Sequence, residues 1–180
     1  MPFIKLTPGN TVKPAVRAWY GGFWVIILAL LASHQAVAVH QADQVLVVKS
    51  ERMLYLQRNG EPLRSYPVAL GPVPRGHKMQ QGDERTPEGH YVLDFKNASS
   101  RFYKSIRISY PSPRDRLRAS ELGVDPGGDI MIHGQPDLSR QSLAGVQLFN
   151  WTNGCIAVTN EQMDEIWELV PLGTPIEIRP

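Results

Sequence analysis

Residues 105–110 read Ser105-Ile-Arg-Ile-Ser-Tyr110 and alternate strictly between polar and apolar side chains. Because successive side chains of a strand point to opposite faces of a sheet, this pattern predicts a strand with Ile106, Ile108 and Tyr110 on its buried face. On both sides of it, short apolar runs bounded by turn residues predict further strands at 45–48, 53–56, 63–70, 91–95, 129–133 and 174–178. The sequence therefore predicts a mostly β fold.

Two helical segments interrupt this series. Residues 113–122 form a short helix candidate that ends at Gly123, a residue common just past helix ends. Near the C-terminus, apolar side chains recur at helical spacing at positions 163, 166, 167 and 170, behind a capping box formed by Thr159 and Gln162. The Gly- and Pro-rich connection at 71–89 is longer than loops in compact domains usually are, and we expect it to be functional.

The composition indicates one ordinary domain. The chain has 180 residues, 42% apolar and 20% charged, which is enough to bury a core. Its single cysteine, Cys155, excludes an intramolecular disulfide and any multi-cysteine metal site. The thiol is then structural, reactive or part of an intermolecular bridge.

Residues 1–38 have the pattern of a signal peptide. They contain three basic residues and no acid, then the ten-residue apolar run 23–32, and they end in Ala36-Val-Ala38. An uncleaved anchor is the alternative, although the run is shorter than the roughly 20 residues that span a bilayer. We therefore expect export to the periplasm or cell envelope and a catalytic domain at residues 44–179.

The basic charge belongs to this leader. Removing its three cations changes the formal charge from +2 to −1. The remainder has no stripe of Lys and Arg interleaved with aromatic residues, so we expect no nucleic-acid partner. The sequence leaves the oligomeric state open.

The candidate chemistry lies where two predicted elements meet. His133-Gly134 ends a predicted strand, and the turn Thr152-Asn-Gly-Cys155 precedes the C-terminal helix. A thiol needs a base or cation to become a nucleophile, and His133 is the candidate base. The carbonyl of Gly134 would hold the tautomer of this ring, and the amides of Gly154 and Cys155 would bind an oxyanion. An inert core cysteine beside a packed histidine is the alternative.

These motifs resemble the signature of the L,D-transpeptidase catalytic domain, also called the YkuD-type domain. In that family, His-Gly precedes Ser/Thr-x-Gly-Cys, as His133-Gly134 precedes Thr152-x-Gly-Cys155 here. Three further blocks also look like family blocks: Gly71-x-x-Pro-x-Gly-x-Lys78, Gly82-Asp83-x-Arg-Thr-Pro-Glu-Gly89-x-Tyr91 and Pro126-Gly-Gly-Asp-Ile-x-Ile-His133. The resemblance implies a β-sandwich-like domain with short helices.

The resemblance also implies an activity. Cys155 would attack the diaminopimelate carbonyl of a peptidoglycan tetrapeptide stem, release D-Ala, and pass the acyl group to an amine in cell-wall biogenesis. It implies no metal and no organic cofactor. A hydrolytic amidase that releases peptide or a murein-attached lipoprotein is one alternative, because the residues after Cys155 look closer to a subgroup with such members. A non-enzymatic wall-binding domain is another.

The assignment of substrate-binding residues rests on weaker patterns. Thr152, Asn153 and Gly154 are candidates because they adjoin the thiol, whereas many family members have an arginine where this chain has Ala157. Arg85 and Tyr110 are candidates for the groove, with a solvated arginine and a packed strand tyrosine as alternatives. His77 and His90 are expected on the surface, and Trp151 is expected either to cover the site or to pack.

Overall fold

The computed structural model describes residues 41–136 and 149–180, so the predicted signal peptide at 1–38 lies outside the described residues. Eight strands form one mixed sheet in the order β3-β2-β1-β8-β4-β5-β6-β7. The first half contains β1 (Gln44–Val48), β2 (Met53–Arg58), β3 (Glu61–Pro67) and β8 (Pro175–Arg179). The second half contains β5 (Tyr103–Ile108), β6 (Met131–His133) and β7 (Ile156–Ala157), and β4 (Gly89–Ser100) joins the halves.

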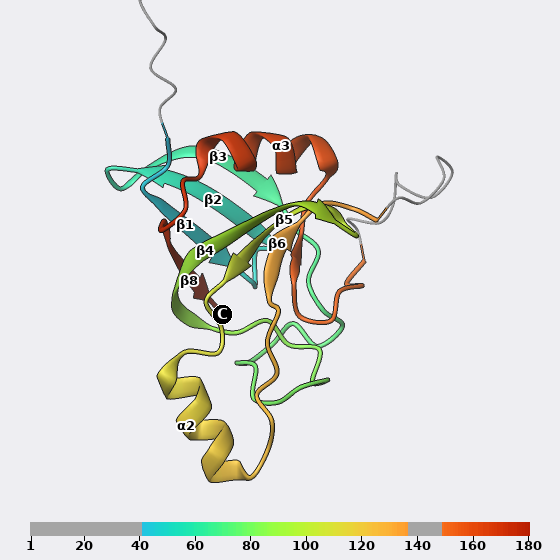
Figure 1. Cartoon of the computed structure of the whole chain (residues 1–180). Coiled ribbons are helices and arrows are strands. Elements are labelled where there is room, and N and C mark those ends of the chain that lie inside the picture. The colour runs from blue at the N-terminus through green and yellow to red at the C-terminus, as the bar shows by residue number, and fades with distance from the viewer. Residues whose placement is uncertain (1–40, 137–148) are drawn as a thin grey trace, which may run out of the picture. The chain divides into compact units, whose positions relative to one another are not determined.

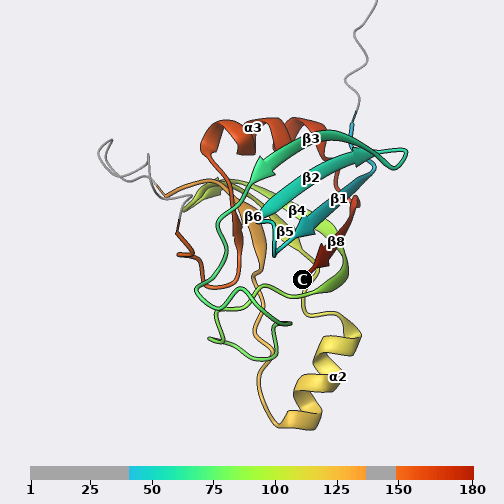
Figure 2. The ribbon, with the colours of Figure 1, turned by 180° about the vertical axis from the view of Figure 1, so that it is seen from behind.

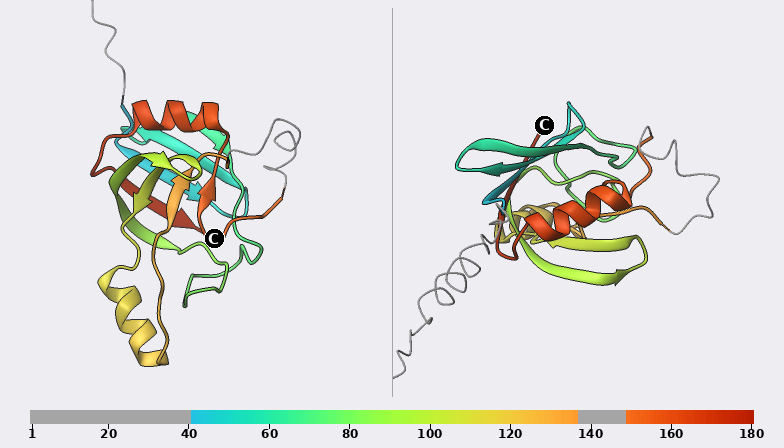
Figure 3. Two further views of the ribbon diagram at one scale, coloured as in Figure 1. Left: turned by 45° about the vertical axis from the view of Figure 1, so that its right-hand side comes forward. Right: turned by 90° about the horizontal axis from the view of Figure 1, so that it is seen from above.

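The sheet folds over so that its two halves face each other as layers (Figures 1 and 3). Strand β4 makes this possible because its first residues pair with β8 and its later residues pair with β5. At the far end, Ala69 and Ala157 exchange two backbone hydrogen bonds of 2.9 Å, which link the segment after β3 to β7. The mostly β, sandwich-like prediction is confirmed, as a single sheet folded on itself.

The core lies between these layers. The prediction for residues 105–110 is confirmed in its buried face, because Ile106, Ile108 and Tyr110 are buried and Arg107 is exposed, but β5 ends at Ile108 and Ser105 is buried as well. Strands β1, β2 and β8 contribute alternate buried side chains in the same way. Burying such side chains stabilises a fold by roughly 1.5–3 kcal/mol each, which makes this pattern the main determinant of the sheet.

Two helices lie at opposite ends of the folded sheet (Figures 1 and 2). Helix α3 (Asn160–Leu169) begins at the predicted capping box and buries Met163 and Ile166. Helix α2 (Pro113–Leu122) has the predicted bounds and ends at Gly123, whose φ of 67° is the left-handed conformation that glycine adopts readily. No helix in residues 41–136 or 149–180 is long and apolar enough to cross a membrane.

Candidate active site

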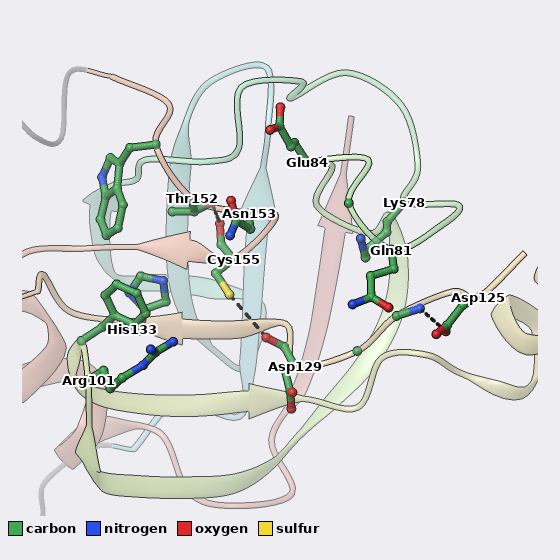
Figure 4. A pocket seen from close by; sticks show the side chains of 15 residues that line it. Lys78, Gln81, Glu84, Arg101, Asp125, Asp129, His133, Thr152, Asn153 and Cys155 are labelled. Atoms are coloured by element: carbon green, nitrogen blue, oxygen red, sulfur yellow. Dashed lines mark hydrogen bonds between the residues drawn. The ribbon is translucent and has the colours of Figure 1, made fainter.

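Two adjacent parallel strands bring His133 and Cys155 to one pocket. His133 is the last residue of β6, and Cys155 immediately precedes β7, which pairs with β6 through Ile132 and Ile156. Both side chains line a pocket of about 1000 Å³ (Figure 4). The other lining residues are Lys78, Gln81, Gly82, Glu84, Arg101, Phe102, Asp125, Gly127, Gly128, Asp129, Trp151, Thr152 and Asn153. The structure thus places the predicted nucleophile and base in a shared cavity.

The imidazole of His133 is held in one tautomer. Its Nδ1 lies 2.6 Å from the carbonyl oxygen of Gly134, the contact expected from the sequence. A carbonyl only accepts hydrogen bonds, so Nδ1 carries the proton and Nε2 of the neutral ring is left as a proton acceptor. Burial lowers the pKa of His133, and the Gly134 bond opposes this only in part. The ring is therefore kept neutral, with Nε2 unprotonated and able to accept a proton.

Two aromatic side chains enclose this imidazole. The ring of Phe102 stacks on it with centroids 4.6 Å apart, and Trp151 meets it edge to face at 5.6 Å. Phe102 and Trp151 also contact each other, at 5.9 Å between ring centroids. Trp151 therefore both packs and borders the pocket, which joins the two interpretations of its place in the sequence.

The thiol of Cys155 lies against the backbone carbonyl of Asp129. Its Sγ–H donates to the carbonyl oxygen of Asp129 at 3.4 Å. Burial raises the pKa of Cys155, and the carboxylate of Asp129 adds to that rise, while the amide of Met131 opposes it. Within the described residues, Sγ has no hydrogen bond to the His133 ring. With this raised pKa the thiol needs a base to become a nucleophile, and His133 in the same pocket is the candidate.

The turn before Cys155 is fixed by Thr152 and Gly154. The Thr152 hydroxyl donates to the carbonyl of Cys155 at 2.7 Å and accepts from the amide of Gly154 at 3.3 Å. Gly154 has φ 108°, and a Cβ there would lie 2.5 Å from the carbonyl oxygen of Arg85. The backbone of Arg85 thus leaves room only for glycine at position 154.

The hydrogen bonds of this turn show which predicted oxyanion donors and substrate-binding residues are available. The amide of Gly154 is already engaged by Thr152, whereas no backbone partner of the Cys155 amide occurs in the described part of the chain. Asn153 is exposed at the pocket and Thr152 is buried beneath it. Of the predicted oxyanion donors, the amide of Cys155 is the one left available.

Arg85 and Tyr110 do not line the pocket. Tyr110 is buried, and its hydroxyl donates to the carbonyl of Pro126 at 3.0 Å. The guanidinium of Arg85 lies beside Gly76, away from the thiol. The placement of Tyr110 agrees with the packed strand tyrosine that was its alternative, and Arg85, expected either in the groove or in solvent, is half-buried outside the pocket lining.

The long connection after β3 forms one wall of the pocket. Asp83 fixes it by accepting from the Lys78 ammonium at 2.9 Å and from the amides of Met79 and Gln80 at 2.7 and 3.1 Å. Burial acts to raise the pKa of Asp83, but these hydrogen bonds outweigh it and the pKa is lowered. The length of this connection had suggested a function, and it supplies Lys78, Gln81 and Glu84 to the pocket.

The expectation of a surface position for His77 is wrong. Its side chain is 16% exposed, and Nε2 lies 3.1 Å from a carboxylate oxygen of the buried Asp115. Its Nδ1 accepts from the amide of Glu88 at 3.0 Å. His77 thus joins the long connection to helix α2. His90 is exposed, as expected.

Sequence reasoning missed Phe102 and Arg101. They form the two-residue turn between β4 and β5, because Ser100 pairs with Tyr103. A turn carries no periodic pattern, so no local signal marks them as neighbours of His133. Within residues 41–136 and 149–180, no group of three His, Cys, Asp or Glu side chains is arranged to hold a metal.

Comparison with known proteins agrees with this geometry. Residues 42–178 match the family model of the YkuD L,D-transpeptidase catalytic domain. The chain belongs to this family. A relative in Escherichia coli K12, named "Putative L,D-transpeptidase YafK", is 33% identical over 132 residues, which are 70% of this chain and 46% of the relative. YqjB of Bacillus subtilis, named in the same way, is 31% identical over 53% of each chain.

Two solved structures share the domain. The helical cell shape determining protein Pgp2 from Campylobacter jejuni is 25% identical with a TM-score of 0.58, over 75% of this chain and 46% of that one. Bd1075 from Bdellovibrio bacteriovorus is 25% identical with a TM-score of 0.53, over 77% and 48%. The chain spans about half the length of these relatives, and what it shares with them is the catalytic domain of a family of cell-wall enzymes.

Proposed function

We propose that this L,D-transpeptidase domain transfers an acyl group from a peptidoglycan stem peptide through a thioester on Cys155. The observation that carries the proposal is the 2.6 Å contact of His133 Nδ1 with the Gly134 carbonyl, which leaves Nε2 as the proton acceptor of a ring that lines the same pocket as Cys155. The signal peptide expected from the sequence would bring the domain to this substrate in the cell envelope.

The chemistry proceeds in two balanced steps. The Sγ–H proton of Cys155 moves to Nε2 of His133 as sulfur bonds to the diaminopimelate carbonyl of a tetrapeptide stem. The bond to D-Ala then breaks, and the D-Ala amine leaves with the proton from His133. An acceptor amine next attacks the thioester, gives its proton to His133, and releases the thiol. The amide of Cys155 stabilises the oxyanion in both steps.

Acylation by a carbapenem tests the nucleophile. The wild-type chain is expected to gain the mass of one drug molecule on Cys155, and Cys155→Ser is expected to gain none. His133→Ala should slow acylation by about 10²-fold if the ring is the base. A wild-type chain that gains no adduct would instead favour a wall-binding domain with an inert thiol.

Product analysis identifies the acceptor. Incubation with disaccharide tetrapeptide should yield a 3→3 crosslinked dimer if the acceptor is an amine. Free tripeptide without dimer would mean that water takes this place, which is the hydrolytic alternative, and lipoprotein-linked murein would then be the next substrate to test.

A further inference from the structure

The cations at the pocket differ in their availability. Lys78 is 3% exposed, and its ammonium donates to Asp83 at 2.9 Å and to the carbonyl of Gln80 at 3.0 Å. Arg101 is exposed, and it makes no hydrogen bond or ion pair with any other residue that the structure describes. Of the two cations that line the pocket, Lys78 is thus already paired, whereas Arg101 has no ionic partner among the described residues.

The hairpin turn fixes where this charge lies. Phe102 follows Arg101 in the turn, stacks on His133, and has its amide bonded to the hydroxyl of Ser100 at 3.2 Å. Gly134 fits closely against the same turn, since a Cβ there would lie 3.1 Å from the carbonyl oxygen of Phe102. This places Arg101 on the same side of the pocket as the base, as Figure 4 shows, with its guanidinium carbon 6.0 Å from the centroid of the Phe102 ring.

The position where many family members have an arginine cannot supply a cation here. Ala157 is fully buried in β7, where it pairs with His133 and bonds to Ala69. A stem peptide nevertheless brings carboxylates to the pocket, at the terminus of D-Ala and on the side chain of diaminopimelate. A cation that binds one of them would come from another element of the fold.

The acidic side chains of the pocket are not distributed evenly around it. Glu84, Asp125 and Asp129 line it together with the thiol, and Figure 4 shows Arg101 at the His133 side, away from Asp125. A carboxylate is attracted to the guanidinium and repelled by these acids, so its favourable place is next to Arg101. The planar fork of arginine also suits a carboxylate better than the ammonium of lysine does.

We infer that Arg101 binds a carboxylate of the donor stem peptide and so orients its scissile carbonyl toward Cys155. The inference rests on the proposed function and adds a residue that determines substrate specificity. Arg101 acts by binding, and His133 and Cys155 carry out the chemistry.

Peptide binding without turnover tests this role. In the full chain carrying Cys155→Ala, calorimetry would measure the Kd for the stem tetrapeptide with and without Arg101→Gln. We expect a loss of about 10-fold in affinity, partly recovered by Arg101→Lys, which keeps the charge without the fork. Arg107→Gln is the matched control, because Arg107 is an exposed arginine on β5 that pairs with Asp94. It should leave Kd unchanged.

Two amidated peptides identify the carboxylate. One has an amide at the D-Ala terminus and the other has an amide on the diaminopimelate side chain. The loss caused by Arg101→Gln should disappear with one of them. A change in Kd below twofold with the parent peptide, or an equal loss with both amidated peptides, would overturn the inference.

Failure of this inference is distinguishable from failure of the proposed function. A chain that is acylated on Cys155 and turns over tetrapeptide equally well with Arg101→Gln would contradict the role of Arg101 alone. A wild-type chain that gains no carbapenem adduct would contradict the acyl transfer itself.

Discussion

The ring of Phe102 lies on the imidazole of His133 with their planes 27° apart. The phenyl group comes from the β4–β5 turn and the imidazole from the end of β6, so a hairpin tip covers the candidate base. This contact removes water from one face of the ring and contributes to the burial that lowers the pKa of His133.

The pH dependence of acylation should reflect that lowered pKa. Only neutral His133 can accept a proton, and its pKa lies below the ordinary 6.5. The rate of carbapenem acylation is therefore expected to fall toward low pH with a midpoint below 6.5. The thiol pKa is raised from 9.0, so the reaction of His133→Ala should increase only in the alkaline range. Stopped-flow measurements across pH would show both limbs, and an acid limb centred above 6.5 would contradict the assignment.

Removal of the Phe102 ring should move the acid limb. In Phe102→Ala, water reaches the imidazole, its pKa rises toward 6.5, and acylation is lost at a higher pH than in the wild type. Loss of the stacked ring should also reduce the rate at neutral pH by about 10-fold through poorer positioning. Phe102→Tyr keeps the ring and serves as the conservative control. An unchanged pH profile in Phe102→Ala would show that the contact is only structural.

Substitution of Gly154 should destabilise the fold. A Cβ in Gly154→Ala would lie 2.5 Å from the carbonyl oxygen of Arg85, and φ of 108° is unfavourable for alanine. We expect the free energy of unfolding to fall by about 2 kcal/mol or more, measured by denaturant titration. Gly128→Ala is the matched control, because a Cβ there meets no atom within 4 Å. Equal effects of the two substitutions would refute the close contact.

Substitution of Asp115 should test the contact between His77 of the 71–89 connection and helix α2. The buried carboxylate accepts from the Tyr91 hydroxyl at 3.1 Å and the Ser112 amide at 2.9 Å, and it faces His77. Asp115→Ala leaves these donors unpaired and should lower the free energy of unfolding by about 2–4 kcal/mol. Arg116→Ala, on the exposed side of the same helix, is expected to change stability by less than about 0.5 kcal/mol. A comparable loss from both would argue for general weakening of α2.

Local patterns in the sequence were sufficient for most of the fold. The alternation at 105–110, the bounds of α2 and the capping box of α3 follow from side-chain periodicity and from end signals that act within a few residues. Strand β7 was not predicted, because two residues give no periodicity. The length of β4 was underestimated, since its outer half is polar on both faces and is held by pairing with β5.

The candidate site divides in the same way. The sequence by itself determined which residues carry the proposed chemistry, because a lone thiol, an imidazole and their flanking glycines are properties of the covalent chain. Only the tertiary structure decided their surroundings: the pairing of β6 with β7, the Phe102 and Trp151 rings around His133, the Arg85 carbonyl behind Gly154, and Arg101 at the pocket. These contacts join residues distant in the chain, and their existence depends on how the sheet folds over itself, which no local pattern encodes.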